Sequence, residues 1–111
     1  FDTPKEQETL TLICMHYIKN KYFIKPGQII KPSNIKKIEN IPTIFVHGRL
    51  DIRCPLRMAY ELNKKLKKSE LNIVDGGHTL NETEVANEVV KGLNRLGARL
   101  YPSQYKRLVS K

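Results

Sequence analysis

Hydrophobic residues recur along the chain in two patterns, one typical of amphipathic helices and one typical of buried strands. Near the N-terminus, Thr3-Pro4 and Glu6 form a helix-start signal with a capping box. Apolar residues then recur every three to four positions, which predicts a helix that ends near Asn20. The apolar face of this helix comprises Leu10, Ile13, Cys14 and Tyr17. Residues 21–40 are rich in turn formers, and within them Ser33-Asn34 could open a short helical turn through Ile38.

Two short apolar runs are typical of strands. Thr43–His47 is β-branched and aromatic on both faces, which favours a buried parallel strand ended by Gly48. Leu71–Asp75 predicts a second strand, closed by Gly76-Gly77. Between them, Pro55 begins a helix whose apolar face comprises Met58, Ala59, Leu62 and Leu66.

A third amphipathic segment follows the second strand. Thr79 or Asn81 could cap this helix, with Glu82 and Glu84 in its first turn and Gly97 at its end. Its expected buried side comprises Val85, Val89, Leu93 and Leu96. A last short helix is expected from Pro102 to Val109.

The order strand, helix, strand predicts an α/β fold with a parallel pair of strands. Two strands are too few for a doubly wound sheet, so the remaining strands are expected upstream of this chain. The chain also begins with Phe1, and its only methionines are Met15 and Met58. We therefore expect a processed or excised piece of a longer protein.

The composition narrows the functional classes. The chain has 111 residues and a formal net charge of +9, with 40% hydrophobic residues, which is typical of one globular domain or part of one. Its lysine clusters lack interleaved arginines and aromatic residues, so we expect a solvated basic surface and no nucleic-acid partner. No apolar run is long enough for a membrane span, and no signal peptide is evident. Two cysteines form no disulfide framework, which favours a reducing, cytoplasmic location.

Two residues with catalytic potential follow the predicted strands. Asp51 comes after the first strand and His78 after the second, so both are expected at the same edge of the sheet. A carboxylate beside an imidazole is the arrangement of a catalytic triad, and the order Asp then His fits that of α/β-hydrolases. Asp51 could also be a turn or helix-cap residue, and His78 an ordinary loop histidine. The three histidines lack metal-ligand spacing, and no glycine-rich phosphate loop is present, so neither a metal nor another cofactor is predicted.

The segment from Ile41 to Pro55, which contains His47-Gly48-Arg49-Leu50-Asp51-Ile52-Arg53-Cys54-Pro55, closely resembles the acid-bearing segment of prolyl iminopeptidases. These peptidases form a family of α/β-hydrolases. The resemblance covers residues 41–96, about half of the chain. It continues at Ala59, Leu62, Glu70, Leu71, Val74, Gly77 and His78.

The resemblance implies a fold and a set of roles. The chain would be the C-terminal part of an α/β-hydrolase fold, with Asp51 as triad acid and His78 as general base. Cys54 matches a family cysteine close to the active site, although a small buried hydrophobe at a helix start is an equal interpretation. The family removes N-terminal proline from peptides without a metal ion. On this basis residues 1–24 are the end of a helical cap, 25–40 a linker, 41–97 the hydrolase core and 98–111 a basic tail.

The chain departs from the family pattern at two points. It has no Gly-x-Ser-x-Gly nucleophile motif, so we expect it to be inactive alone and to need the N-terminal part of the same hydrolase. In the cap, the family glutamate that holds the substrate's amino group falls near Cys14, and no acidic residue lies between Glu8 and Glu39. Two alternatives therefore stay open, another esterase or amidase and a non-catalytic basic binding module. As an isolated piece the chain is expected to self-associate through an unpaired strand edge.

Overall fold

A computed structural model describes residues 3–109, apart from the side chains of Leu108 and Val109. The chain has the α/β fold that the sequence predicted. In chain order its elements are α1 (Pro4–Lys19), the 3-10 turn η1 (Lys21–Phe23), α2 (Pro32–Ile38), β1 (Thr43–Gly48), α3 (Leu56–Asn63), β2 (Ser69–Val74), α4 (Thr83–Leu100) and α5 (Pro102–Val109).

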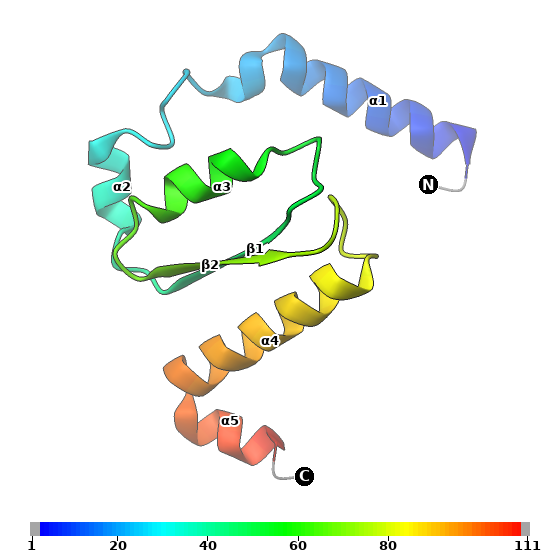
Figure 1. Cartoon of the computed structure of the whole chain (residues 1–111). Helices are drawn as coiled ribbons and strands as arrows, with labels where there is room; N and C mark the ends of the chain where they lie inside the picture. Colours follow the sequence, from blue (N-terminus) through cyan, green and yellow to red (C-terminus); the bar gives the residue numbers. More distant parts are fainter. Residues whose placement is uncertain (1–2, 110–111) are drawn as a thin grey trace.

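The two strands of the described chain pair in parallel, as their apolar composition predicted. Thr43 lies opposite Ser69 at one end of the ladder, and Gly48 lies opposite Val74 at the other. The connection between the strands runs through α3. Figure 1 shows α3 on one side of the strand pair and α4 on the other, so each face of this small sheet has one helix.

Helix α4 is fastened to the sheet by packing and by polar contacts. Gly92 is buried against the side chain of Ile44, where a Cβ atom would lie 3.3 Å from a methyl carbon. Glu88 accepts a hydrogen bond from the amide of Asn72 (2.9 Å) and another from Arg95 (3.1 Å). Arg95 also donates to Glu70 of β2 (2.9 Å). Its hydrogen bonds to Glu70 and, less strongly, to Glu88 raise the pKa of its guanidinium above the ordinary value.

Little of the described chain is fully buried. Among the hydrophobic residues of 3–109, only Ile35, Leu66 and Val85 are buried, and each keeps 7–8% of its surface exposed. No residue of α1 is buried, and Figure 1 shows this helix standing apart from the strands. None of the helices within 3–109 has the length and apolarity that crossing a membrane requires.

The expected start of α1 is confirmed in detail. The hydroxyl of Thr3 accepts from the backbone N–H of Glu6 (3.3 Å), and the Glu6 carboxylate accepts from the backbone N–H of Thr3 (3.0 Å). This is the reciprocal capping box that the sequence predicted. The short helix near Ser33-Asn34 and the last helix from Pro102 are also confirmed.

The predicted limits of α4 were wrong at both ends. Glu82 is the N-cap residue and makes no side-chain cap bond, so neither Thr79 nor Asn81 caps the helix. The helix also runs through Gly97, whose carbonyl accepts from the N–H of Tyr101 (2.9 Å). A glycine inside a helix lowers the stability of the helix by only about 1 kcal/mol relative to alanine, and contacts along the rest of the helix can offset this loss. Leu93, expected to be buried, is 64% exposed.

Helix α3 is shorter than its apolar pattern predicted. It ends at Asn63, and Leu66 is buried in the turn that follows it. The hydroxyl of Ser69 donates to the carbonyls of Asn63 (3.1 Å) and Leu66 (3.2 Å), which stabilises the turn before β2. Met58, placed on the apolar face, is 68% exposed in the described chain.

Candidate active site

The loops that follow the two strands lie against each other because glycines allow it. Beyond the ladder, the N–H of Arg49 donates to the carbonyl of Val74 (2.9 Å), and the N–H of Leu50 donates to that of Gly76 (3.0 Å). A Cβ atom on Gly48 would overlap the carbonyl oxygens of Gly76 and Gly77. The absence of a side chain at Gly48 therefore lets the loop after β2 cross over the end of β1.

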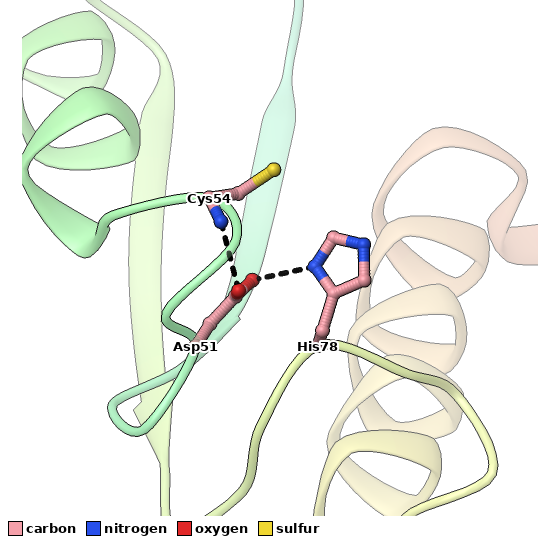
Figure 2. A group of neighbouring side chains, drawn as sticks. All are labelled: Asp51, Cys54 and His78. Atoms are coloured by element: carbon pink, nitrogen blue, oxygen red, sulfur yellow. Dashed lines mark hydrogen bonds and ion pairs between the residues drawn. The ribbon is translucent and has the colours of Figure 1, made fainter. Parts of the chain in front are cut away.

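This crossing brings together the two residues that the sequence singled out. Nδ1 of His78 lies 2.9 Å from Oδ2 of Asp51, and the Nδ1–H group donates to the carboxylate (Figure 2). The other ring nitrogen points away from Asp51 in this view. The side chain of Asp51 is 6% exposed and that of His78 is 38% exposed. One partner is thus held inside the loop while the other remains accessible.

The second oxygen of Asp51 is held by the backbone of its own loop. Oδ1 accepts from the N–H groups of Cys54 (2.8 Å) and Arg53 (2.9 Å). The Cys54 bond and the His78 bond lower the pKa of Asp51 from 3.8 to about 2, against the opposing effect of burial. Asp51 is therefore a fixed carboxylate anion at neutral pH.

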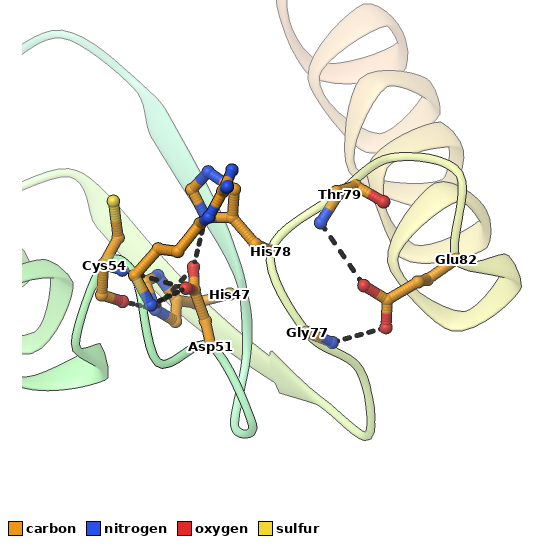
Figure 3. A network of polar contacts seen from close by, with 8 residues as sticks. His47, Asp51, Cys54, Gly77, His78, Thr79 and Glu82 are labelled. Atoms are coloured by element: carbon orange, nitrogen blue, oxygen red, sulfur yellow. Dashed lines mark hydrogen bonds and ion pairs between the residues drawn. The ribbon is translucent and has the colours of Figure 1, made fainter.

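His47 is a neighbour of the pair that sequence reasoning missed. Its Nε2–H group donates to the carbonyl of Cys54 (2.8 Å), and Nε2 lies 3.8 Å from Oδ2 of Asp51 (Figure 3). The hydrogen bond from His47 therefore holds the Asp51 loop against the end of β1. The sequence offers one signal for this role, which is the position of His47. It is the last residue of β1 that has a side chain, and it stands four residues before Asp51.

Glu82 holds the other loop. Its carboxylate accepts from the N–H of Gly77 (2.5 Å) and from the N–H of Thr79 (3.4 Å), the residues on either side of His78 (Figure 3). The sequence placed Glu82 in the first turn of the helix as a partner of the helix dipole. In the structure its carboxylate instead turns back from the N-cap position and binds the backbone of the His78 loop.

Cys54 lies beside the pair and is exposed, so the interpretation of it as a small buried hydrophobe is wrong. Its sulfur lies within 4.8 Å of donor atoms of both Asp51 and His78. Figure 2 shows the three side chains grouped at the edge of the sheet. Spacing along the chain could not reveal this trio, because His78 comes from the other strand loop.

Comparison with known proteins points to one family, although no protein-family model matches the chain. The chain is 37% identical over 84 residues to a proline iminopeptidase of Arabidopsis thaliana, covering 75% of this chain and 22% of that protein. It is 38% identical over 60 residues to a probable proline iminopeptidase of Leptolyngbya boryana, covering 53% and 19%. It is 29% identical over 99 residues to a proline iminopeptidase of Neisseria gonorrhoeae, covering 86% and 32%.

The chain thus spans between about a fifth and a third of the length of these curated relatives. The matches agree with the α/β architecture and with the resemblance that the segment around Asp51 carries. They support a peptidase-like α/β-hydrolase region. Over most of its length, the chain is similar in sequence to the C-terminal part of curated proline iminopeptidases.

Proposed function

We propose that this chain supplies the acid and base of a serine peptidase that releases N-terminal proline from peptides, with a nucleophile that lies outside the chain. The observation that carries the proposal is the hydrogen bond between Nδ1 of His78 and Oδ2 of Asp51, at 2.9 Å. A loop histidine or a turn-forming aspartate would not need this contact. Both residues also lie on loops after parallel strands, where α/β folds place their active sites.

The geometry supports a defined division of labour. Because Nδ1–H is donated to Asp51, the lone pair of the neutral imidazole is on Nε2, which points away from the carboxylate (Figure 2). Nε2 would accept the proton of the attacking hydroxyl group and later return it to the leaving amine. Asp51 would fix the tautomer and stabilise the imidazolium form, a role that its low pKa supports because the carboxylate stays ionised.

The nucleophile is the part of the mechanism that this chain does not supply. Its serines are Ser33, Ser69, Ser103 and Ser110, and none lies in a Gly-x-Ser-x-Gly motif. The partial exposure of His78 leaves room for a hydroxyl group contributed by another segment. The chain alone is therefore proposed to be inactive, and its partner is the remainder of the same hydrolase.

The substrate part of the proposal depends on the relatives. The curated proteins that match the chain are named proline iminopeptidases, which supports a peptide with an N-terminal proline. Against it stands the absence of an acidic residue between Glu8 and Glu39, the stretch expected to provide a carboxylate for the substrate's ammonium group. An esterase or amidase with the same acid and base is the alternative, and assays with different substrates distinguish it from a prolyl peptidase.

The decisive experiment assays the longer protein that contains this chain. Three substrates are compared: a fluorogenic prolyl amide, the corresponding leucyl amide and a simple aryl ester. Asp51→Asn and His78→Gln are compared with Glu84→Gln, a control at an exposed residue of α4 outside the site. We expect hydrolysis of the prolyl amide to fall by roughly 10³-fold or more in both site variants and to stay unchanged in the control.

Each result has a separate meaning. Equal rates in all variants would refute the assignment of Asp51 and His78. Hydrolysis of the ester but not of the prolyl amide, lost in both site variants, would refute the peptidase specificity and keep the acid and base. The 111-residue chain, assayed alone with the same substrates, is expected to show no turnover.

A further inference from the structure

Cys54 adds a third kind of donor atom to the Asp51–His78 pair. Its thiol is exposed, and the proposed hydrolytic mechanism gives it no role. A thiolate, an imidazole and a carboxylate are the three side-chain ligands that Zn²⁺ prefers. Within residues 3–109, these are the residues whose donor atoms gather closely enough to hold a metal ion, each within 4.8 Å of the other two.

We propose that Asp51, Cys54 and His78 form a binding site for a divalent zinc-type cation. The cation would be bound by Oδ2 of Asp51, by Nδ1 of His78 and by the sulfur of Cys54. With three protein ligands, the fourth tetrahedral position would be left to water, as in zinc sites that are open to solvent.

The distances need only a small adjustment. Zinc ligands bound at about 2.0–2.3 Å in a tetrahedron lie roughly 3.3–3.7 Å from one another. Oδ2 and Nδ1 are already 2.9 Å apart, close to this spacing. The largest separation within the trio is at most 4.8 Å, and the exposed Cys54 side chain can close the difference by turning about its Cα–Cβ bond.

Two of the three ligands are held in place by neighbours that do not compete for the metal. Oδ1 of Asp51 is held by the N–H groups of Arg53 and Cys54, which leaves Oδ2 to face the site. The loop of His78 is held by the Glu82 carboxylate through Gly77 and Thr79. Such outer contacts orient metal ligands and strengthen binding.

The charges of the site also suit a divalent cation. A carboxylate, a thiolate and a neutral imidazole carry two negative charges, which balance those of Zn²⁺. The net charge of +9 on the whole chain repels cations at long range, but physiological salt screens charges beyond about 8 Å. The local donors therefore decide the affinity.

Metal binding and the Asp51–His78 hydrogen bond exclude each other. The cation would bind the lone pair on Nδ1 of His78, so the ring proton would move to Nε2 and keep the imidazole neutral, while the proton from Cys54 would pass to solvent. In the longer protein the bound metal would thus prevent Asp51 and His78 from acting as an acid–base pair, and it would be a reversible inhibitor. This consequence rests on the proposed function, whereas the metal site itself does not.

The test uses the metal-free longer protein that contains this chain, titrated with Zn²⁺ by calorimetry and with Co²⁺ by absorption spectroscopy. Co²⁺ bound by a thiolate gives a sulfur-to-metal charge-transfer band that oxygen and nitrogen ligands do not give. We expect one site per chain and this band in the wild-type protein. Cys54→Ser, His78→Gln and Asp51→Asn should each weaken Zn²⁺ binding by roughly 100-fold, since loss of even an outer contact costs about 10–100-fold.

Matched variants separate this site from adventitious binding. Cys14→Ser and His16→Gln remove the same donor types from α1 and should change the affinity less than twofold. Cys54→Ser alters an exposed side chain, and an unchanged circular dichroism spectrum would show that its fold is intact. Urea should abolish binding, because the site depends on two loops meeting.

Unchanged affinity in Cys54→Ser, no charge-transfer band, or a large loss in Cys14→Ser would each overturn the proposal. None of these results bears on the proposed peptidase, because no substrate is turned over in the test. Conversely, an inactive longer protein that still contained the metal site would refute the function alone.

Discussion

The backbone of Gly77 crosses Gly48 so closely that Gly48 has no room for a side chain. This contact joins the loop after β2 to the end of β1. It also sets the distance between Asp51 and His78, because each lies within three residues of the crossing. A residue with no functional group of its own is therefore central to the candidate active site.

Replacing Gly48 by alanine is expected to separate the two loops. The new methyl group would meet backbone carbonyl oxygens, which cannot move aside as a side chain can. We expect a loss of roughly 1–3 kcal/mol in the free energy of unfolding, typical of overpacking, together with loss of the Asp51–His78 hydrogen bond. Denaturant titration and the NMR signal of the Asp51 carboxyl carbon measure the two effects. Gly97→Ala in α4 is the control, and an equal change there would contradict the prediction.

Replacing Glu82 by glutamine should loosen the loop that carries His78. The glutamine amide would present a neutral and therefore weaker acceptor to the N–H groups of Gly77 and Thr79. A hydrogen bond to a charged group contributes about 1.5–3 kcal/mol to stability. Amide hydrogen exchange at Gly77 and Thr79 should accelerate while exchange in β1 stays the same. Glu84→Gln, an exposed change in the first turn of α4, should leave both amides as they are. Identical exchange in the two variants would argue against this role of Glu82.

The low pKa of Asp51 predicts a particular dependence of stability on pH. The folded pKa of about 2 lies below the usual value of 3.8, so the ionised carboxylate stabilises the fold above pH 4. This contribution should be lost as the pH falls through 4 towards 2. The measurement is the difference in unfolding free energy between wild type and Asp51→Asn, since the amide cannot ionise. A difference that stayed constant from pH 5 to pH 2 would contradict the assignment.

The exposed apolar surface predicts that the isolated chain associates. Only three hydrophobic residues of the described chain are buried, and β1 pairs with β2 along one edge alone within this part of the chain. We expect binding of a hydrophobic dye and a sedimentation coefficient that rises with concentration. A monomer at all concentrations with no dye binding would contradict the prediction. Adding the N-terminal segment of the proposed longer hydrolase should suppress both signals, because it would cover this surface.

Local signals predicted much of the fold. The capping box at Thr3 and Glu6 fixed the start of α1, and the apolar run at Thr43–His47 predicted a parallel strand. The errors arose where tertiary contacts override a local preference. Gly97 would end an isolated helix, but α4 gains enough from its packing on the sheet to continue past it. Leu93 fits the apolar stripe of α4, yet within the described chain little covers it.

The candidate site also has features that the sequence predicts and features that only the fold determines. The meeting of Asp51 and His78 follows from strand order, because parallel strands end at one edge. The roles of His47 and Glu82 could not be predicted, because each binds a backbone group whose direction depends on the fold of a loop. The closeness of Cys54 to His78 could not be predicted either, because it also depends on how the loops fold. It needs two loops to meet, and the residues that make this possible are glycines.

The parallel pairing of β1 with β2 has a consequence for how such a hydrolase can evolve. Asp51 and His78 lie on loops that a single strand–helix–strand unit positions, and that unit occupies one continuous stretch of sequence. Their mutual geometry can therefore be inherited intact while the segments that provide nucleophile and substrate pocket diverge. In the proposed hydrolase, selection for a new substrate would act mainly outside this unit, and the Asp51–His78 pair would be retained while the specificity changed.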